Sequence, residues 1–150
     1  MAIRDGRILA VGPAADLGSR VQAHQHLDAM GQVVMPGFVD PHTHLVWAGS
    51  RADEFEMRIS GATYMEIMAA GGGIMNTVRH TRAASLQDLV SQTKPRLERM
   101  LAYGTTTVEV KTGYGLDTED EIKQLRAIQH LQQESPMTLV PTFLGAHANP

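Results

Sequence analysis

The sequence contains no cysteine, which excludes a disulfide framework and any metal site built on thiolates. A metal ion bound here would need histidine and carboxylate ligands. No apolar run approaches the roughly 20 residues of a membrane-spanning helix, and the first residues lack the apolar core of a signal peptide. We therefore expect a soluble cytoplasmic protein without a membrane partner, because the lack of disulfides fits a reducing compartment.

The chain also lacks a large excess of charge of either sign. The chain has 13 basic and 16 acidic residues, a formal net charge of −3. So small an acidic excess gives no support to a nucleic-acid partner. Hydrophobic residues make up 43% and charged residues 19%, which is typical of a globular protein rather than a disordered one. A length of 150 residues predicts one domain or a piece of one.

Residues 1–35 have the pattern of short strands. One strand is predicted over 7–12 after an Asp5-Gly6 turn signal, and a second apolar run at 33–35 stops at Pro36-Gly37. These pieces are too few to close a sheet on their own. Because the composition changes at Pro36-Gly37, we interpret 1–35 as part of a separate small domain.

From residue 36 onward, strands alternate with helices. The predicted strands are 38–40, 105–110 and 137–144, and the predicted helices are 63–70, 86–103 and 118–134. This order predicts parallel βαβ units and the α/β fold class. We expect Pro95 to kink or split the second helix. Capping boxes are predicted at Ser85 with Asp88 and at Thr118 with Glu121.

A parallel sheet of three strands would have two open edges and too little cover. The chain also stops just after a strand, where a helix should follow. We therefore expect it to be the truncated first part of a longer barrel or doubly wound protein.

The sharpest chemical signal is the pair His42 and His44 after the strand 38–40. Residues two apart share a face if strand geometry continues, so both imidazoles can reach one metal ion. Zinc and iron both accept imidazole nitrogen. The alternative is two surface histidines spaced this way by chance, and the surrounding segment 36–44 favours the ligand pair.

In this segment the sequence resembles the amidohydrolase superfamily, and within it the imidazolonepropionase family. The resemblance extends over nearly the entire chain, and the segments that carry it are 36–51, 54–58, 61–64, 71–74, 109–116 and 142–147. They are much more specific than the histidine pair alone.

The resemblance implies a TIM-type (β/α) barrel beside a small β-sandwich built from both ends of the chain. Residues 1–35 would belong to the β-sandwich, and residues 36–150 would form the first part of a metal-dependent barrel, with its first three strands. The implied reaction is hydrolysis of 4-imidazolone-5-propanoate to N-formimino-L-glutamate in histidine degradation. One zinc or iron ion and a homodimeric parent protein are implied as well.

By this resemblance, His42 and His44 match metal ligands. Four further residues match substrate-binding positions, namely Arg51, Tyr64, Tyr114 and His147. The chemistry of these side chains fits independently, because a guanidinium binds a propionate through two parallel hydrogen bonds. A tyrosine hydroxyl can donate to a carboxylate or a ring atom. His147 directly follows the third strand and could donate to the ring carbonyl or its developing oxyanion.

Two histidines do not complete a catalytic metal site, which usually has three or more protein ligands plus water. The other ligands and the acid/base carboxylates are expected beyond residue 150. We therefore expect the chain alone to be inactive, to bind metal weakly and to be poorly soluble as a monomer. Two alternatives remain open: another amidohydrolase, such as a nucleobase deaminase, or a non-catalytic module that binds metal or a partner. The choice between zinc and iron remains open too.

Overall fold

The computed structural model describes residues 1–148 and divides the chain into two compact units. The first unit is Met1–Pro36, and the second begins at Gly37. The last two residues of the predicted 36–150 segment lie outside the described residues. In the part of the chain that is described, no helix has both the length and the apolarity needed to cross a membrane.

The first unit contains a β-hairpin and a helix. Strands β1 (Ala2–Arg4) and β2 (Arg7–Ala10) pair antiparallel, as the turn signal predicted. Asp5 and Gly6 connect them with φ of 52° and 70°. Two positive φ values in a two-residue loop are those of a type I′ turn, which matches the twist of the paired strands.

Two expectations for the first unit are wrong. Residues 14–20 form the helix α1 (Ala14–Arg20), which no strand pattern indicated. It follows Pro13, whose missing N–H costs nothing at a helix start. The apolar run 33–35 forms no strand and is exposed. An apolar run becomes a strand only where a neighbour supplies ladder partners, and none among residues 1–148 pairs with it.

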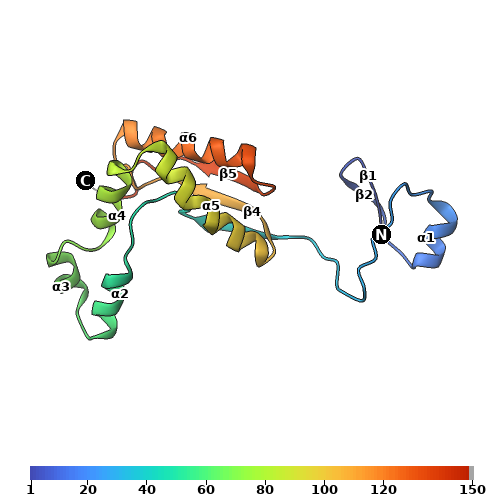
Figure 1. The fold of residues 1–150 in the computed structure, drawn as a ribbon, viewed down its shortest axis with the longest axis horizontal. Coiled ribbons are helices and arrows are strands. Elements are labelled where there is room, and N and C mark those ends of the chain that lie inside the picture. The colour runs from blue at the N-terminus through green and yellow to red at the C-terminus, as the bar shows by residue number, and fades with distance from the viewer. Residues whose placement is uncertain (149–150) are drawn as a thin grey trace. The chain divides into compact units, whose positions relative to one another are not determined.

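The second unit has mixed α/β structure. Its elements in chain order are β3 (Phe38–Thr43), α2 (Ala52–Ile59), α3 (Tyr64–Ala69), α4 (Ile74–Ala83), α5 (Leu86–Ala102), β4 (Thr105–Lys111), α6 (Thr118–Glu134) and β5 (Thr138–Thr142). The strand order is β3-β4-β5, and both pairs are parallel. The predicted βαβ units are therefore confirmed. Helices α5 and α6 supply the crossovers and lie next to each other (Figure 1).

The hydrophobic core lies between the sheet and the helices α5 and α6. Val108 and Val110 of the central strand β4 are fully buried, together with Leu89 of α5 and Ile128 and Leu131 of α6. Each such side chain stabilises the fold by roughly 1.5–3 kcal/mol relative to an exposed one. Because α5 and α6 both pack against β4, the positions from which the loops at the strand ends start are fixed.

Helix α5 runs as one element through Pro95, so it is not split. Proline removes the hydrogen bond to the carbonyl of Ser91, and both residues lie on the exposed face of the helix. Water can reach that carbonyl and satisfy it. The capping box at the start of α5 is confirmed, since Ser85 Oγ accepts from the Asp88 N–H at 3.1 Å and Asp88 accepts from the Ser85 N–H at 3.1 Å.

The predicted capping box at the start of α6 is wrong. Asp117 is the N-cap, and its carboxylate accepts from the Asp120 N–H at 2.8 Å. Thr118 is already the first helical residue. Glu121 therefore lies one position past the box and points into the interior, where it is 1% exposed. Both residues 117 and 118 are capping types, and only the tertiary environment of Glu121 decides between them.

Residues 45–85 contain two helices that the sequence pattern did not indicate. Helix α3 matches the predicted helix 63–70, but α2 and α4 were missed. Neither has a side-chain hydrogen bond at its N-cap, which is Arg51 for α2 and Gly73 for α4. The start of α4 is satisfied from a distance instead, because Glu54 of α2 accepts from the Gly73 N–H at 3.0 Å. Such a cap cannot be predicted from the residues next to the helix, because Glu54 lies 19 positions before Gly73 in the sequence.

Arg96 of α5 fixes the segment that follows β3. Its Nη1 donates to the carbonyl of Leu45 at 3.0 Å and to that of Trp47 at 2.8 Å. The guanidinium carbon lies 3.6 Å from the centroid of a Trp47 ring. Burial lowers the pKa of Arg96, but an arginine still carries its charge in a protein. The chain just after His44 is thus held by a charged donor.

Replacing Arg96 with methionine should lower the free energy of unfolding by about 2–4 kcal/mol, because charged hydrogen bonds and a cation–π contact are lost. Urea unfolding followed by the fluorescence of Trp47, the single tryptophan, measures the change. Arg99→Met on the exposed side of α5 is the matched control, and we expect a change within about 0.5 kcal/mol. Equal destabilisation by both substitutions would show that the contacts of Arg96 contribute nothing specific.

Candidate active site

The candidate residues lie in the last residues of the three parallel strands or just after them. His42 lies in β3 and His44 directly after it, Tyr114 follows β4, and His147 follows β5. Parallel strands end at the same edge of a sheet, so the loops after them meet there. Thr112 joins two of these loops, since its hydroxyl accepts from the Leu144 N–H at 2.9 Å.

Three aromatic rings pack against one another at this edge. The rings of His44 and His147 stack with centroids 4.4 Å apart and an interplanar angle of 13°. The Tyr114 ring lies 5.0 Å from that of His44 and 5.5 Å from that of His147. The His42 ring lies 6.5 Å from that of His44. The structure therefore brings both predicted metal ligands together with two of the predicted substrate-binding residues.

Strand β3 continues past residue 40, through His42 to Thr43. The hydroxyl of Thr43 donates to the carbonyl of Glu109 on β4 at 2.6 Å and fixes the strand end. Asp40 accepts from the backbone N–H of His42 at 3.3 Å. Asp40 therefore shapes the backbone before the histidine pair, and the two imidazoles are separated by one residue that is tied to the neighbouring strand.

His44 has the properties of a metal ligand. Burial and then the charge of His147 lower its pKa, and the backbone of Thr112 offsets part of this effect. A lowered pKa favours the neutral imidazole, which is the form that binds metal. Its Nδ1 is buried without a hydrogen-bond partner, and such an atom needs one. Two imidazoles thus fit a metal ion in part, although residues 1–148 contain no group of three or more side chains that could hold one.

His147 is oriented by the loop after β4. Its Nδ1 lies 3.1 Å from the carbonyl oxygen of Gly113, which only accepts, so Nδ1 carries the proton. The neutral ring then offers an acceptor at Nε2, and donation to an oxyanion would require the protonated ring. Gly113 has φ of 118°, and a Cβ there would lie 2.8 Å from the His147 Cβ. Only glycine allows this close approach.

Arg51 is held by a buried carboxylate. Its Nε donates to Glu54 Oε2 at 2.8 Å. Glu54 also accepts from the Gly73 N–H and from Asn76 Nδ2, both at 3.0 Å. Burial acts to raise the pKa of Glu54, but the hydrogen bonds from Asn76, Arg51 and Gly73 outweigh it and bring the pKa below its usual range. The carboxylate therefore stays charged and fixes the guanidinium through Nε.

The charge of Arg51 acts on Tyr114, one of the three packed rings, which together with His44 and His147 forms the ring cluster. Burial raises the pKa of Tyr114, and the charge of Arg51 acts in the opposite direction. Tyr114 therefore keeps its phenolic proton and can donate a hydrogen bond. Tyr64 differs from the other candidates. It is the first residue of α3 and is exposed, and among the described residues no ring or hydrogen-bond contact joins it to the cluster.

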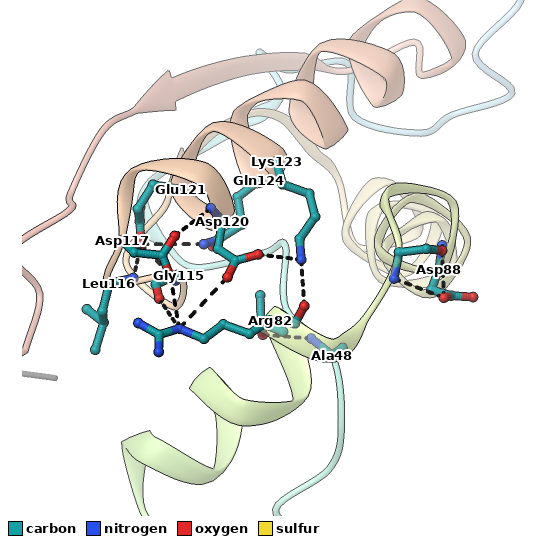
Figure 2. Close-up of polar contacts among 12 residues, drawn as sticks. Ala48, Arg82, Asp88, Gly115, Leu116, Asp117, Asp120, Glu121, Lys123 and Gln124 are labelled. Atoms are coloured by element: carbon teal, nitrogen blue, oxygen red, sulfur yellow. Dashed lines mark hydrogen bonds and ion pairs between the residues drawn. The ribbon is translucent and has the colours of Figure 1, made fainter.

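Two carboxylates near these loops were not predicted from the sequence to belong to the site. Glu109 accepts from Lys111 Nζ and from Thr142 Oγ1, each at 2.7 Å, and its other oxygen is buried without a partner. These two hydrogen bonds hold the pKa of Glu109 below its usual range. The alternation of Glu109 and Lys111 along β4 is the signal that places them on one face. The second carboxylate is Glu121, which contacts the loop after β4 (Figure 2).

Comparisons with known proteins match the whole chain. Residues 25–84 fit a model described as amidohydrolase family, and residues 1–20 fit a bacterial imidazolonepropionase-like composite domain. The imidazolonepropionase of Herpetosiphon aurantiacus is 59% identical over 150 residues, which are 100% of this chain and 35% of that protein. The one of Chloroflexus aggregans is 57% identical with the same coverage. The one of Symbiobacterium thermophilum is 56% identical over 153 residues, 36% of its length. The chain thus spans about 35% of the length of these curated relatives.

Proposed function

We propose that this chain, whose residues 25–84 match an amidohydrolase family model, carries part of the active site of an imidazolonepropionase. The reaction is hydrolysis of the cyclic amide C–N bond of 4-imidazolone-5-propanoate to N-formimino-L-glutamate, a step of histidine degradation. The observation that carries the proposal is the gathering of His42, His44, Tyr114 and His147 at one edge of a parallel sheet. The sequence of the whole chain is 48–59% identical to proteins named imidazolonepropionase.

The three parallel strands would be the first part of a TIM-type (β/α) barrel, with residues 1–35 in a small β-sandwich. Two observations support this. The sheet is built from βαβ units with parallel strands, as a barrel is, and the candidate residues lie at the strand ends, where barrel enzymes have their active sites. Because the relatives are nearly three times as long as the matched segment, the other metal ligands and the acid/base carboxylates would lie in the rest of the protein.

His42 and His44 would hold a zinc or iron ion in part, which would polarise the ring carbonyl and lower the pKa of a bound water. The chain's own residues then bind and orient the substrate. The neutral hydroxyl of Tyr114 donates to a ring or carboxylate oxygen. The His147 ring stacks on the His44 ring with 4.4 Å between centroids, which holds it beside the proposed metal ligand.

Arg51 would bind the propionate. Its Nε is engaged by Glu54, which leaves the two Nη groups to meet both oxygens of a carboxylate. Tyr64 stays a proposed substrate-binding residue on the strength of the sequence resemblance alone. A nucleobase carries no carboxylate for Arg51, so the arginine favours imidazolone propionate over the substrates of a deaminase.

A chimera tests the proposal. In it, these 150 residues replace the matching segment of the Herpetosiphon aurantiacus relative. We expect the chimera to hydrolyse 4-imidazolone-5-propanoate and to leave cytosine and guanine unchanged. The 150-residue chain alone should show no turnover and far less than one metal ion per chain, because it offers two ligands where catalytic sites use about three or more. Deamination of a nucleobase by the chimera, or metal-dependent hydrolysis by the isolated chain, would contradict the proposal.

A further inference from the structure

A buried carboxylate lies under the loop that follows β4. Glu121 Oε2 accepts from the Gly113 N–H at 2.9 Å, and its Oε1 accepts from the Gly115 N–H at 2.7 Å and the Leu116 N–H at 2.9 Å. Figure 2 shows the side chain turned from the first turn of α6 toward the backbone of Gly115 and Leu116. Hydrogen bonds to a charged acceptor are roughly twice as strong as neutral ones.

The loop depends on these contacts for its shape. Leu116 has φ of 58°, a left-handed conformation that costs a residue with a Cβ roughly 1–2 kcal/mol. Gly115 touches the helix itself, since a Cβ there would lie 2.5 Å from the Glu121 nitrogen. A strained residue and a closely packed one therefore sit side by side, and both donate to the same carboxylate oxygen.

A second set of contacts closes the other side of the loop. Arg82 of α4 donates through Nε to the carbonyl of Gly115 at 2.6 Å and pairs with Asp117 at 3.2 Å. Lys123 of α6 donates to the carbonyl of Arg82 at 2.8 Å and pairs with Asp120 at 2.6 Å (Figure 2). Contacts from α4 and from α6 thus fix the loop after β4.

Glu121 has no ion-pair partner among residues 1–148, although it is 1% exposed. A buried charge without an opposite charge is unfavourable unless hydrogen bonds satisfy it. Here three N–H donors need two acceptor oxygens, which a carboxylate supplies and a carboxamide does not. The residue type is therefore set by the loop that it holds.

We propose that Glu121 is a positioning residue that acts through Tyr114. Tyr114 lies between Gly113 and Gly115, and the N–H groups of both glycines end on the Glu121 carboxylate. The Gly113 carbonyl also accepts from His147, so the same loop sets the second ring. The inference rests on the proposed function, because it takes Tyr114 as a substrate-binding residue.

Amide hydrogen exchange tests the contact without any assay of activity. In the chimera, Glu121→Gln should speed exchange at the Gly113, Gly115 and Leu116 amides by about 10-fold or more, because a carboxamide turns an N–H toward at least one of them. The control is Glu119→Gln, an exposed residue of the same helix turn with the same charge change. Unchanged exchange at all three amides would overturn the proposal. Should the glutamine variant fail to accumulate, Glu121→Asp keeps the charge and is too short to reach all three donors.

A double-mutant cycle tests the action through Tyr114. We expect Glu121→Gln to lower kcat/KM for 4-imidazolone-5-propanoate by about 10–100-fold, because a displaced group of the site costs this much. Adding Tyr114→Phe to the glutamine variant should change kcat/KM by less than about 2-fold, although Tyr114→Phe alone lowers it clearly. Additive losses would mean that Glu121 acts on stability only and would overturn the proposal. If the unsubstituted chimera does not hydrolyse the substrate, the proposed function fails, and the exchange measurement alone decides the role of Glu121.

Discussion

His44→Asn in the chimera should lower turnover of 4-imidazolone-5-propanoate by about 10³-fold or more, because a metal that loses a ligand no longer lowers the pKa of its water. Metal content per chain should fall with it. The structure supports this through the lowered pKa of His44 and through its buried Nδ1, which lacks a partner. Of the two histidines, His44 is the one that is packed against Tyr114 and His147.

Metal content by atomic absorption and initial rates measure this effect. The matched control is His130→Asn, an exposed histidine of α6 with the same change of side chain, and it should keep both metal and rate. A His44→Asn chimera with full metal content and an unchanged rate would show that His44 is no ligand. Loss of both properties in the control would point instead to general damage by the substitution.

Arg51→Met should raise KM for 4-imidazolone-5-propanoate by about 100-fold and leave kcat within a few-fold, because two hydrogen bonds to the propionate are lost. The difference should shrink to a few-fold for the substrate whose carboxylate is replaced by a primary amide, since that group has no charge to lose. Glu54 makes this test sharp, because it fixes the guanidinium in the unsubstituted protein.

The matched control for Arg51 is Arg58→Met in the last turn of α2, which is exposed and removes the same charge. We expect its KM to stay within about 2-fold, since a distant surface charge adds little. An equal rise in KM for the acid and the amide would show that Arg51 does not contact the carboxylate. Steady-state rates over a range of substrate concentrations separate kcat from KM.

The elements with strong periodicity were predictable from the sequence. Strand β4 is mostly β-branched with Val108 and Val110 buried, and α5 and α6 have long apolar faces, so their bounds agree with the prediction to within a residue or so. The parallel order then followed from the alternation of strands and helices. The helices α2 and α4 could not be found in this way, because tertiary contacts such as Glu54 with Gly73 satisfy their ends.

The histidine pair and its place at the end of a strand were predictable, because the spacing and the strand pattern are both local, although β3 runs on through His42. What brings Tyr114 to His44 is not local. It depends on Glu121, which looks in the sequence like the second half of a capping box and in the structure accepts from residues 5–8 positions earlier. If Thr118 were the N-cap, Glu121 would complete a capping box. Because Asp117 is the N-cap, Glu121 is free to accept from the loop, and this depends on its buried environment.

Because Arg96 binds the segment after His44, that segment becomes ordered only after α5 has been synthesised. Arg96 lies 51 positions after Leu45, whose carbonyl it binds. At a synthesis rate of about 5–20 residues per second, roughly 3–10 seconds separate the two residues on the ribosome. The histidine pair therefore leaves the ribosome before the helix that orders its neighbourhood exists. A metal ion that reached the two histidines in that interval would meet a segment that Arg96 does not yet hold.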